Sequence, residues 1–91
     1  MGAVGGDLAT LQDLHTKFGD AASQTESLKT SVTNSLAAAV WTGPNADAFR
    51  QAWEGFKKTL TDIEAALTDG QTDVKNQHNN IAAATGAPER I

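Results

Sequence analysis

The sequence has no cysteine and no tyrosine, and only two prolines in 91 residues. Without cysteine, neither a disulfide framework nor a thiolate metal site can stabilise so small a chain. No window approaches the roughly 18 consecutive apolar residues that a transmembrane helix needs. The N-terminal stretch lacks the basic and apolar regions of a cleavable signal peptide. We therefore expect one small domain, without a transmembrane segment, near the size at which a single core is marginal.

Positive charge is scarce as well. Seven Lys and Arg stand against eleven Asp and Glu, which gives a formal net charge of -4. Nucleic-acid binding draws its affinity from clustered Lys and Arg on phosphates, so we expect no nucleic-acid partner. A membrane-lytic hairpin would need a basic polar face, which the acidic balance disfavours.

Residues that carry chemistry in enzymes are few and scattered. His15 and His78 have no neighbour at a spacing typical of zinc ligands. The acid pair Asp62 and Glu64 is expected on a solvent-facing surface without a pocket. The sequence has neither a glycine-rich phosphate loop nor a nucleophile elbow. We predict that the protein is not an enzyme and has no metal site and no cofactor.

Two long runs of sequence are typical of helices. Residues 7–39 contain no proline, their apolar residues repeat with a helical period, and Asp7 is a suitable N-cap. A second helix is expected over about 44–80, because Pro44 suits the first helical position. A turn at 40–43 would fold the helices antiparallel. The predicted fold class is all-α, an antiparallel helix-turn-helix hairpin.

The apolar pattern weakens toward the C-terminus. Gly70 and Gln77 interrupt it, and we expect fraying from about Gln77 onward because small and polar residues bury too little to offset ordering entropy. The helical-hairpin domain is predicted to span 1–84. Residues 85–91 are expected to form a flexible tail.

Apolar residues recur every seven positions along both helices, as in a heptad pattern. Each helix has one main row, and a companion row three residues further along. Together with Leu36, the large members of these rows form the predicted hairpin and dimer interface. They are Leu11, Leu14, Phe18, Leu28, Val32, Leu36, Phe49, Trp53, Phe56, Leu60, Ile63 and Leu67.

These rows are wider than the seam between two helices. A single hairpin offers each helix one neighbour, so part of the apolar surface would remain in contact with water. A second hairpin would cover it and complete a four-helix bundle. We therefore expect a dimer.

The expected turn contains Trp41, Thr42 and Gly43. A W-x-G tripeptide between two amphipathic helices at mid-chain, in a protein of about this length without cysteine or signal peptide, resembles the WXG100 family of type VII secretion proteins. The following "GPNADAFRQAW" is also similar to the family's second-helix opening, and the similarity covers almost the whole chain. The second W-x-G, Trp53-Glu54-Gly55, lies in a heptad row and is interpreted as helix.

The resemblance implies a non-enzymatic protein that a type VII system exports as a folded dimer, and that acts as effector, carrier or secretion partner. The dimer would be a homodimer or a heterodimer with a paralogous WXG100 protein. An ATPase of the secretion apparatus would be a further partner. The protein would be cytoplasmic before export, and then secreted or at the cell surface, without a cleavable signal peptide.

In the family, the W-x-G turn is thought to act together with a C-terminal signal of tyrosine, three residues, then Asp or Glu. This chain has no tyrosine. The degenerate candidate is Thr85 with Glu89, which keeps the acid without the aromatic ring. Many family members work as pairs in which one partner carries the signal, so this chain is compatible with being the passenger of a heterodimer.

Two alternatives remain open from the sequence. Trp41 can be a core plug that fills the end of the bundle, with Gly43 allowing a backbone geometry and a close approach that a Cβ would hinder. The whole chain can also be a cytoplasmic coiled-coil adaptor whose apolar stripe binds a partner helix.

Overall fold

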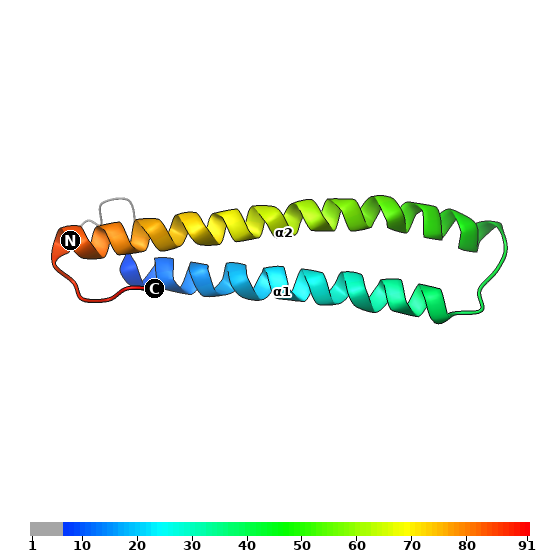
Figure 1. Ribbon diagram of the computed structural model, residues 1–91, viewed down its shortest axis with the longest axis horizontal. Coiled ribbons are helices and arrows are strands. Elements are labelled where there is room, and N and C mark those ends of the chain that lie inside the picture. The colour runs from blue at the N-terminus through cyan, green and yellow to red at the C-terminus, as the bar shows by residue number, and fades with distance from the viewer. Residues whose placement is uncertain (1–6) are drawn as a thin grey trace.

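The computed structural model describes residues 7–91, so the first six residues of the predicted domain lie outside it. The described chain consists of two helices, α1 (Leu8–Ala38) and α2 (Pro44–Thr85). They lie side by side and antiparallel in a rod of 63 × 17 × 16 Å, with the turn at one end (Figure 1). The predicted all-α hairpin is confirmed. Neither helix is long and apolar enough to cross a membrane.

Local chemistry explains where the helices begin. The Asp7 carboxylate accepts hydrogen bonds from the backbone N–H groups of Ala9 and Thr10, at 2.9 and 3.2 Å, which satisfies two of the free donors of the first turn. Gly43 is the N-cap of α2, and Pro44 follows at the first helical position. We expected the turn at 40–43, and the structure has it at 39–43.

The end of α2 differs from the expectation. We expected the helix to end near residue 80, and it continues to Thr85, where Gly86 closes it in the left-handed conformation at φ 75°. The predicted tail then turns back along the hairpin (Figure 1). The side chain of Asn79 accepts from the Ile91 N–H at 3.0 Å and donates to the Ile91 carbonyl at 3.2 Å.

Tight packing between the helices explains why α2 does not fray at its glycine. A Cβ on Gly70 would lie 2.9 Å from the ring of Phe18, so the absence of a side chain at Gly70 leaves room for that ring. Across the seam, a Cβ on Gly19 would lie 2.6 Å from the Gln71 amide, which donates to the His15 carbonyl at 3.3 Å. Gly70, which interrupts the apolar pattern in the sequence, is thus a position of close helix–helix contact.

The main heptad row of each helix lies in the seam, as expected. In α1 this row is half-buried, and in α2 it includes the fully or nearly buried residues Ala46, Trp53 and Val74. Trp53 is 9% exposed, and its indole N–H donates to the Thr33 hydroxyl of α1 at 3.0 Å.

The second row of the seam differs from the predicted companion row by one position. It is mostly polar and consists of His15, Ala22, Lys29, Leu36, Arg50, Lys57, Glu64, Gln71 and His78. Long polar side chains can fill such positions because their aliphatic stems pack while their polar ends reach partners or water. Glu64 is therefore in the seam, whereas we expected it on a solvent face. His78 is fully buried.

Candidate functional site

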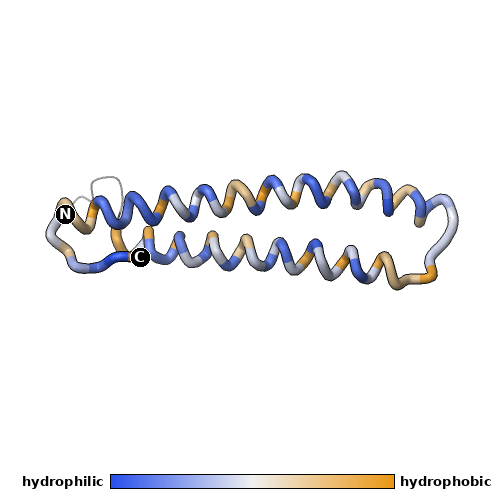
Figure 2. The backbone as a smooth tube through the Cα atoms, viewed as in Figure 1, coloured by the Kyte–Doolittle hydropathy of each residue, from blue (hydrophilic) through white to orange (hydrophobic). Residues whose placement is uncertain are grey.

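The large apolar residues of the predicted companion rows lie outside the seam and form an exposed stripe. Figure 2 shows hydrophobic residues recurring along both helices. The exposed fractions in the stripe range from 38% for Leu14 to 57% for Phe56. We call this surface the apolar stripe; its large members are Leu14, Leu28, Phe49, Phe56 and Ile63.

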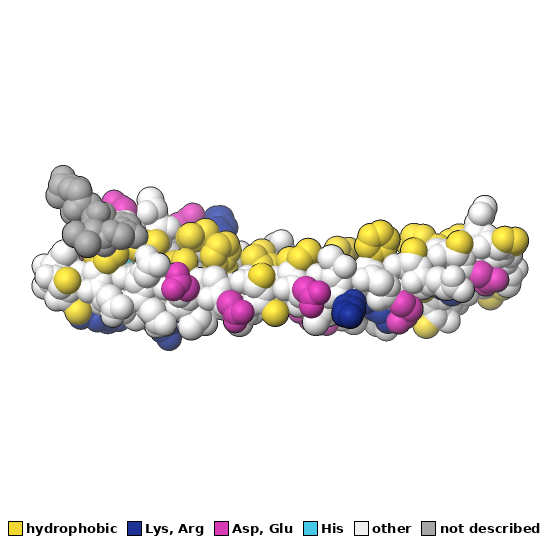
Figure 3. All heavy atoms as spheres, turned by 90° about the horizontal axis from the view of Figure 1, so that it is seen from above, with side chains coloured by type: hydrophobic (Ala, Val, Ile, Leu, Met, Phe, Trp, Pro, Cys, Tyr) yellow, Lys and Arg dark blue, Asp and Glu magenta, His cyan; other side chains and the backbone are white. Residues whose placement is uncertain are grey.

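All members of the apolar stripe lie on one side of the hairpin. Each precedes a residue of the polar seam row by one position, as Leu28 precedes Lys29 and Ile63 precedes Glu64. In an antiparallel pair, equivalent flanking positions of the two helices face the same side of the seam. Seen from above α2, hydrophobic side chains follow one long edge of the rod, and most of the acidic side chains in view lie away from it (Figure 3). The stripe is therefore one continuous surface that crosses both helices.

A cluster of charges joins the helices near the middle of the polar row. Lys29 Nζ lies 2.8 Å from Glu64 Oε1, without the geometry of a directed hydrogen bond, and 3.4 Å from Glu26 Oε1. It also donates to the Thr61 hydroxyl at 2.8 Å. The side chains of Lys29 and Glu64 are largely screened from solvent, with 15% and 18% exposed. The charge of Lys29 is therefore compensated by two carboxylates of the same chain.

Two groups of the cluster titrate away from their ordinary values. The hydrogen bond with the Glu64 carboxyl, followed by the interaction with Lys29, lowers the pKa of Glu26. The interaction with Glu64 is also the main cause that raises the pKa of Lys29, against a smaller opposing effect of burial. Both shifts favour the charged forms of Glu26 and Lys29.

The turn holds an exposed aromatic pair at the end of the apolar stripe. Trp41 is 41% exposed, and its ring centroid lies 5.7 Å from that of Phe49 with the planes tilted by 55°. Val40 beside it is fully exposed. Within the single hairpin, Trp41 is therefore a partly exposed ring packed on one side.

Gly43 gives the turn its shape. Its φ of 111° is a conformation that side-chain-bearing residues rarely adopt. A Cβ at Gly43 would meet nothing within 4 Å, so the requirement is for backbone geometry, and the close approach that we expected is not seen. Thr42 separates Gly43 from Trp41 and is exposed.

Sequence reasoning missed the contacts of Arg50 with the turn. Its guanidinium Nη1 donates to the Trp41 carbonyl at 2.7 Å and its Nη2 donates to the Leu36 carbonyl at 3.2 Å. Its Cζ lies 5.6 Å from the centre of the Trp41 ring. Two signals could have indicated it: α1 has no basic residue in its last turn, and Arg50 lies in the second turn of α2, close to the loop.

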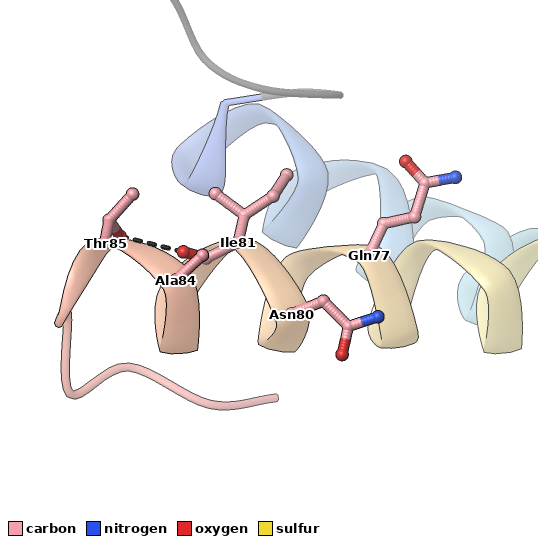
Figure 4. Close-up of a pocket in the computed structure, with 5 residues that line it drawn as sticks. All are labelled: Gln77, Asn80, Ile81, Ala84 and Thr85. Carbon is pink, nitrogen blue, oxygen red and sulfur yellow. Dashed lines mark hydrogen bonds between the residues drawn. The ribbon is translucent and has the colours of Figure 1, made fainter.

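The end of α2 has a hollow of about 410 Å³ (Figure 4). It is lined by Gln77, Asn80, Ile81, Ala84 and Thr85. In Figure 4, Gln77 and Ile81 point in the same direction from α2, and Asn80 points in a different direction. The lining residues have apolar, amide and hydroxyl groups, and none of them is titratable. The hollow is thus suited to accepting an apolar side chain.

The two residues of the degenerate export signal are placed differently. Thr85 is the last residue of α2, and its hydroxyl donates to the Ile81 carbonyl at 2.8 Å. Glu89 is exposed in the returning tail. The structure therefore does not place them on one helical surface.

Within residues 7–91, no group of three or more His, Cys, Asp or Glu side chains is arranged to hold a metal ion. No protein-family model matches the sequence, and no curated protein or solved structure matches it significantly. The resemblance to WXG100 proteins therefore stays a prediction, which rests on the residues of the turn and on their position between the helices.

Proposed function

We propose that this chain is a non-enzymatic WXG100-like protein that a type VII secretion system exports as a folded dimer. It acts as effector, carrier or secretion partner. The observation that carries the proposal is the apolar stripe, which lies on one side of the hairpin and leads to an exposed tryptophan in a W-x-G turn.

The apolar stripe supports the dimer. Large contiguous apolar surfaces mark interaction sites, because their exposure to water is unfavourable. A second hairpin laid on the stripe would give each helix a second neighbour and complete a four-helix bundle. The second hairpin is a copy of this chain or a paralogous WXG100 protein.

The turn supports recognition by the secretion ATPase. Trp41 offers an exposed ring at a fixed turn, and aromatic residues of this kind are common anchors of protein interfaces. The tail lacks the tyrosine of the family signal, so we propose that the paired chain supplies it. The protein is cytoplasmic before export and then secreted or displayed on the cell surface.

The dimer is tested by light scattering on the purified chain. We expect twice the chain mass of 9.5 kDa, or a mixed species of that size once a paralogue is added. Phe56→Asp, which places a charge in the stripe, should dissociate this species while helical circular dichroism persists. The matched control is Ala65→Asp, an exposed position of α2 outside the stripe, which should leave the mass unchanged. If Phe56→Asp retains the full dimer, the stripe is not the interface.

The role of the turn is tested by export of Trp41→Ala in a host with an intact type VII system. We expect less protein outside the cell at unchanged cellular level. Unchanged export of a folded, dimeric variant would remove Trp41 from the recognition site.

The second candidate function is a cytoplasmic adaptor whose apolar stripe binds a helix of an unrelated protein. The separation of Thr85, at the end of α2, from Glu89, in the returning tail, favours it, because the two residues do not form one recognition surface. Export of the wild-type chain, alone or with a paralogue, would exclude the adaptor. A neighbouring gene for a homologue or a membrane ATPase would favour export.

A further inference from the structure

Arg50 connects three parts of the turn through one side chain. It reaches from the second turn of α2 to the Leu36 carbonyl in the last turn of α1 and to the Trp41 carbonyl in the loop. The same guanidinium lies over the Trp41 ring. It is half-buried, so these contacts are partly shielded from water.

The end of α1 explains why a cation is favourable at this place. The last four carbonyls of a helix have no partner within the helix, and they form the negative end of its dipole. The last turn of α1 has no basic residue of its own. Arg50 therefore supplies from α2 the positive charge and the donors that the end of α1 lacks.

The shape of guanidinium matters as much as its charge. Its planar fork can donate to two carbonyls at once and still stack on an aromatic face, which a lysine ammonium cannot reproduce. Phe49, the residue before Arg50, packs against the same indole. Trp41 is thus held by two consecutive residues of α2 while part of its ring stays exposed.

We propose that Arg50 is a positioning residue that fixes Trp41 in the conformation read by its partner. The inference rests on the proposed function, in which Trp41 is the residue that is recognised. A side chain already held in its bound conformation loses less entropy on binding, so the contact strengthens recognition without Arg50 having to touch the partner.

The first measurement follows Trp41 alone. The chain has two tryptophans, so a Trp53→Phe background leaves Trp41 as the only indole. In this background, Arg50→Lys and Arg50→Ala should shift the fluorescence emission of Trp41 to longer wavelength and increase its quenching by acrylamide. The matched control is Lys57→Ala, one heptad further in the same seam row, which should change neither signal.

The second measurement is export of the same substitutions, made in the natural Trp53 chain and checked to be folded and dimeric. Arg50→Lys and Arg50→Ala should lower export in the same direction as Trp41→Ala, and Lys57→Ala should not. Because Arg50→Lys keeps the charge, its failure to rescue export would support the role of the planar fork.

Three results would overturn the inference, and they differ from one another. If both Arg50 variants leave the Trp41 signals unchanged, Arg50 does not position the ring. If the signals change and Trp41→Ala reduces export, but the Arg50 variants are exported normally, the fixed conformation is not what the partner reads. If Trp41→Ala is itself exported normally, the proposed role of Trp41 fails and the inference fails with it, although the spectra still show the contact.

Discussion

The two ends of the hairpin differ in where they place their large side chains. Toward the turn, the exposed large apolar residues are Leu28, Val40, Trp41, Phe49, Phe56 and Ile63. Toward the other end, only Leu14 of the described residues is in this class, although α2 there contains three of the five residues that are buried within 7–91, Val74, His78 and Ala82. The far half therefore completes much of its packing within one chain, and the turn half leaves surface for a partner.

Judged by residue size alone, the half near the turn would be expected to pack better than the far half, and the structure shows the opposite. We expected the far half to fray from about Gln77 onward, because Gly70 and Gln77 interrupt the apolar pattern. Gly70 instead allows the ring of Phe18 to lie against the backbone of α2, and Asn79 holds the returning tail. Small residues bring the helices together in the far half, whereas in the turn half several large residues, such as Phe49 and Phe56, lie outside the seam.

The largest expected effect tests the turn half. Trp53→Ala removes a nearly buried ring and its hydrogen bond to Thr33, so we expect the free energy of unfolding to fall by about 3–5 kcal/mol. Phe56→Ala, three residues further on α2, removes a ring that is 57% exposed. Its cost should be small at dilutions where the protein is monomeric, and should grow with concentration as the dimer forms.

Urea denaturation at several protein concentrations measures both effects. If both variants lower the free energy of unfolding of the monomer equally, the stripe packs within the hairpin. The turn half would then not leave surface for a partner.

The next prediction compares the stability effects of alanine substitutions at two glycines of α2. Gly55 has open space where a Cβ would lie, so Gly55→Ala should stabilise the helix by about 0.5–1 kcal/mol. Gly70→Ala should instead destabilise by about 1–3 kcal/mol, because the new Cβ would displace the ring of Phe18. Thermal unfolding of the two variants gives the comparison, and a stabilising Gly70→Ala would mean that the far half packs loosely.

The smallest effect concerns the cluster of Lys29 between the two halves. The pKa of Glu26 is lowered from 4.5 on folding, so its contribution to stability is present above pH 4.5 and is lost as the pH falls through the folded value. The pKa of Lys29 is raised from 10.5, so its contribution is full below pH 10.5 and is lost as the pH rises through the folded value. Stability from this cluster should be constant between these limits.

A pH series of thermal midpoints tests this expectation. Below pH 4.5 the thermal midpoint should decrease less in Glu26→Gln than in the wild-type chain. The matched control is Asp13→Asn, which removes an exposed ion pair with Lys17 inside α1 and should matter less. If Glu26→Gln leaves the decrease of the thermal midpoint at acid pH unchanged, that decrease is due to other carboxylates.

The sequence predicted what depends on local chemistry. Asp7 and the pair Gly43-Pro44 locate the helix starts to within a residue, because capping and proline geometry act over a few positions. The seven-residue spacing likewise identifies the main seam rows.

The rest depends on tertiary contacts. An apolar pattern shows which side of a helix avoids water, but it does not show which part of that side meets the neighbouring helix. Lys29 and Glu64 fill the second row because they satisfy each other across the seam, which neither helix reveals alone. The end of α2 and the contacts of Arg50 with Trp41 were missed for the same reason.

The antiparallel arrangement also implies an order of folding. Cross-helix contacts join residues 14 positions apart at Arg50 and Leu36, 20 apart at Trp53 and Thr33, 32 apart at Lys29 and Thr61, and 56 apart at Gln71 and His15. Each doubling of the loop costs about 0.6 kcal/mol more in closure entropy, so the contacts nearest the turn are the least costly to form first. Once they exist, each later contact closes only a short additional loop. The hairpin should therefore close like a zipper from the turn, and the region around Trp41 should reach its final form before the far half does.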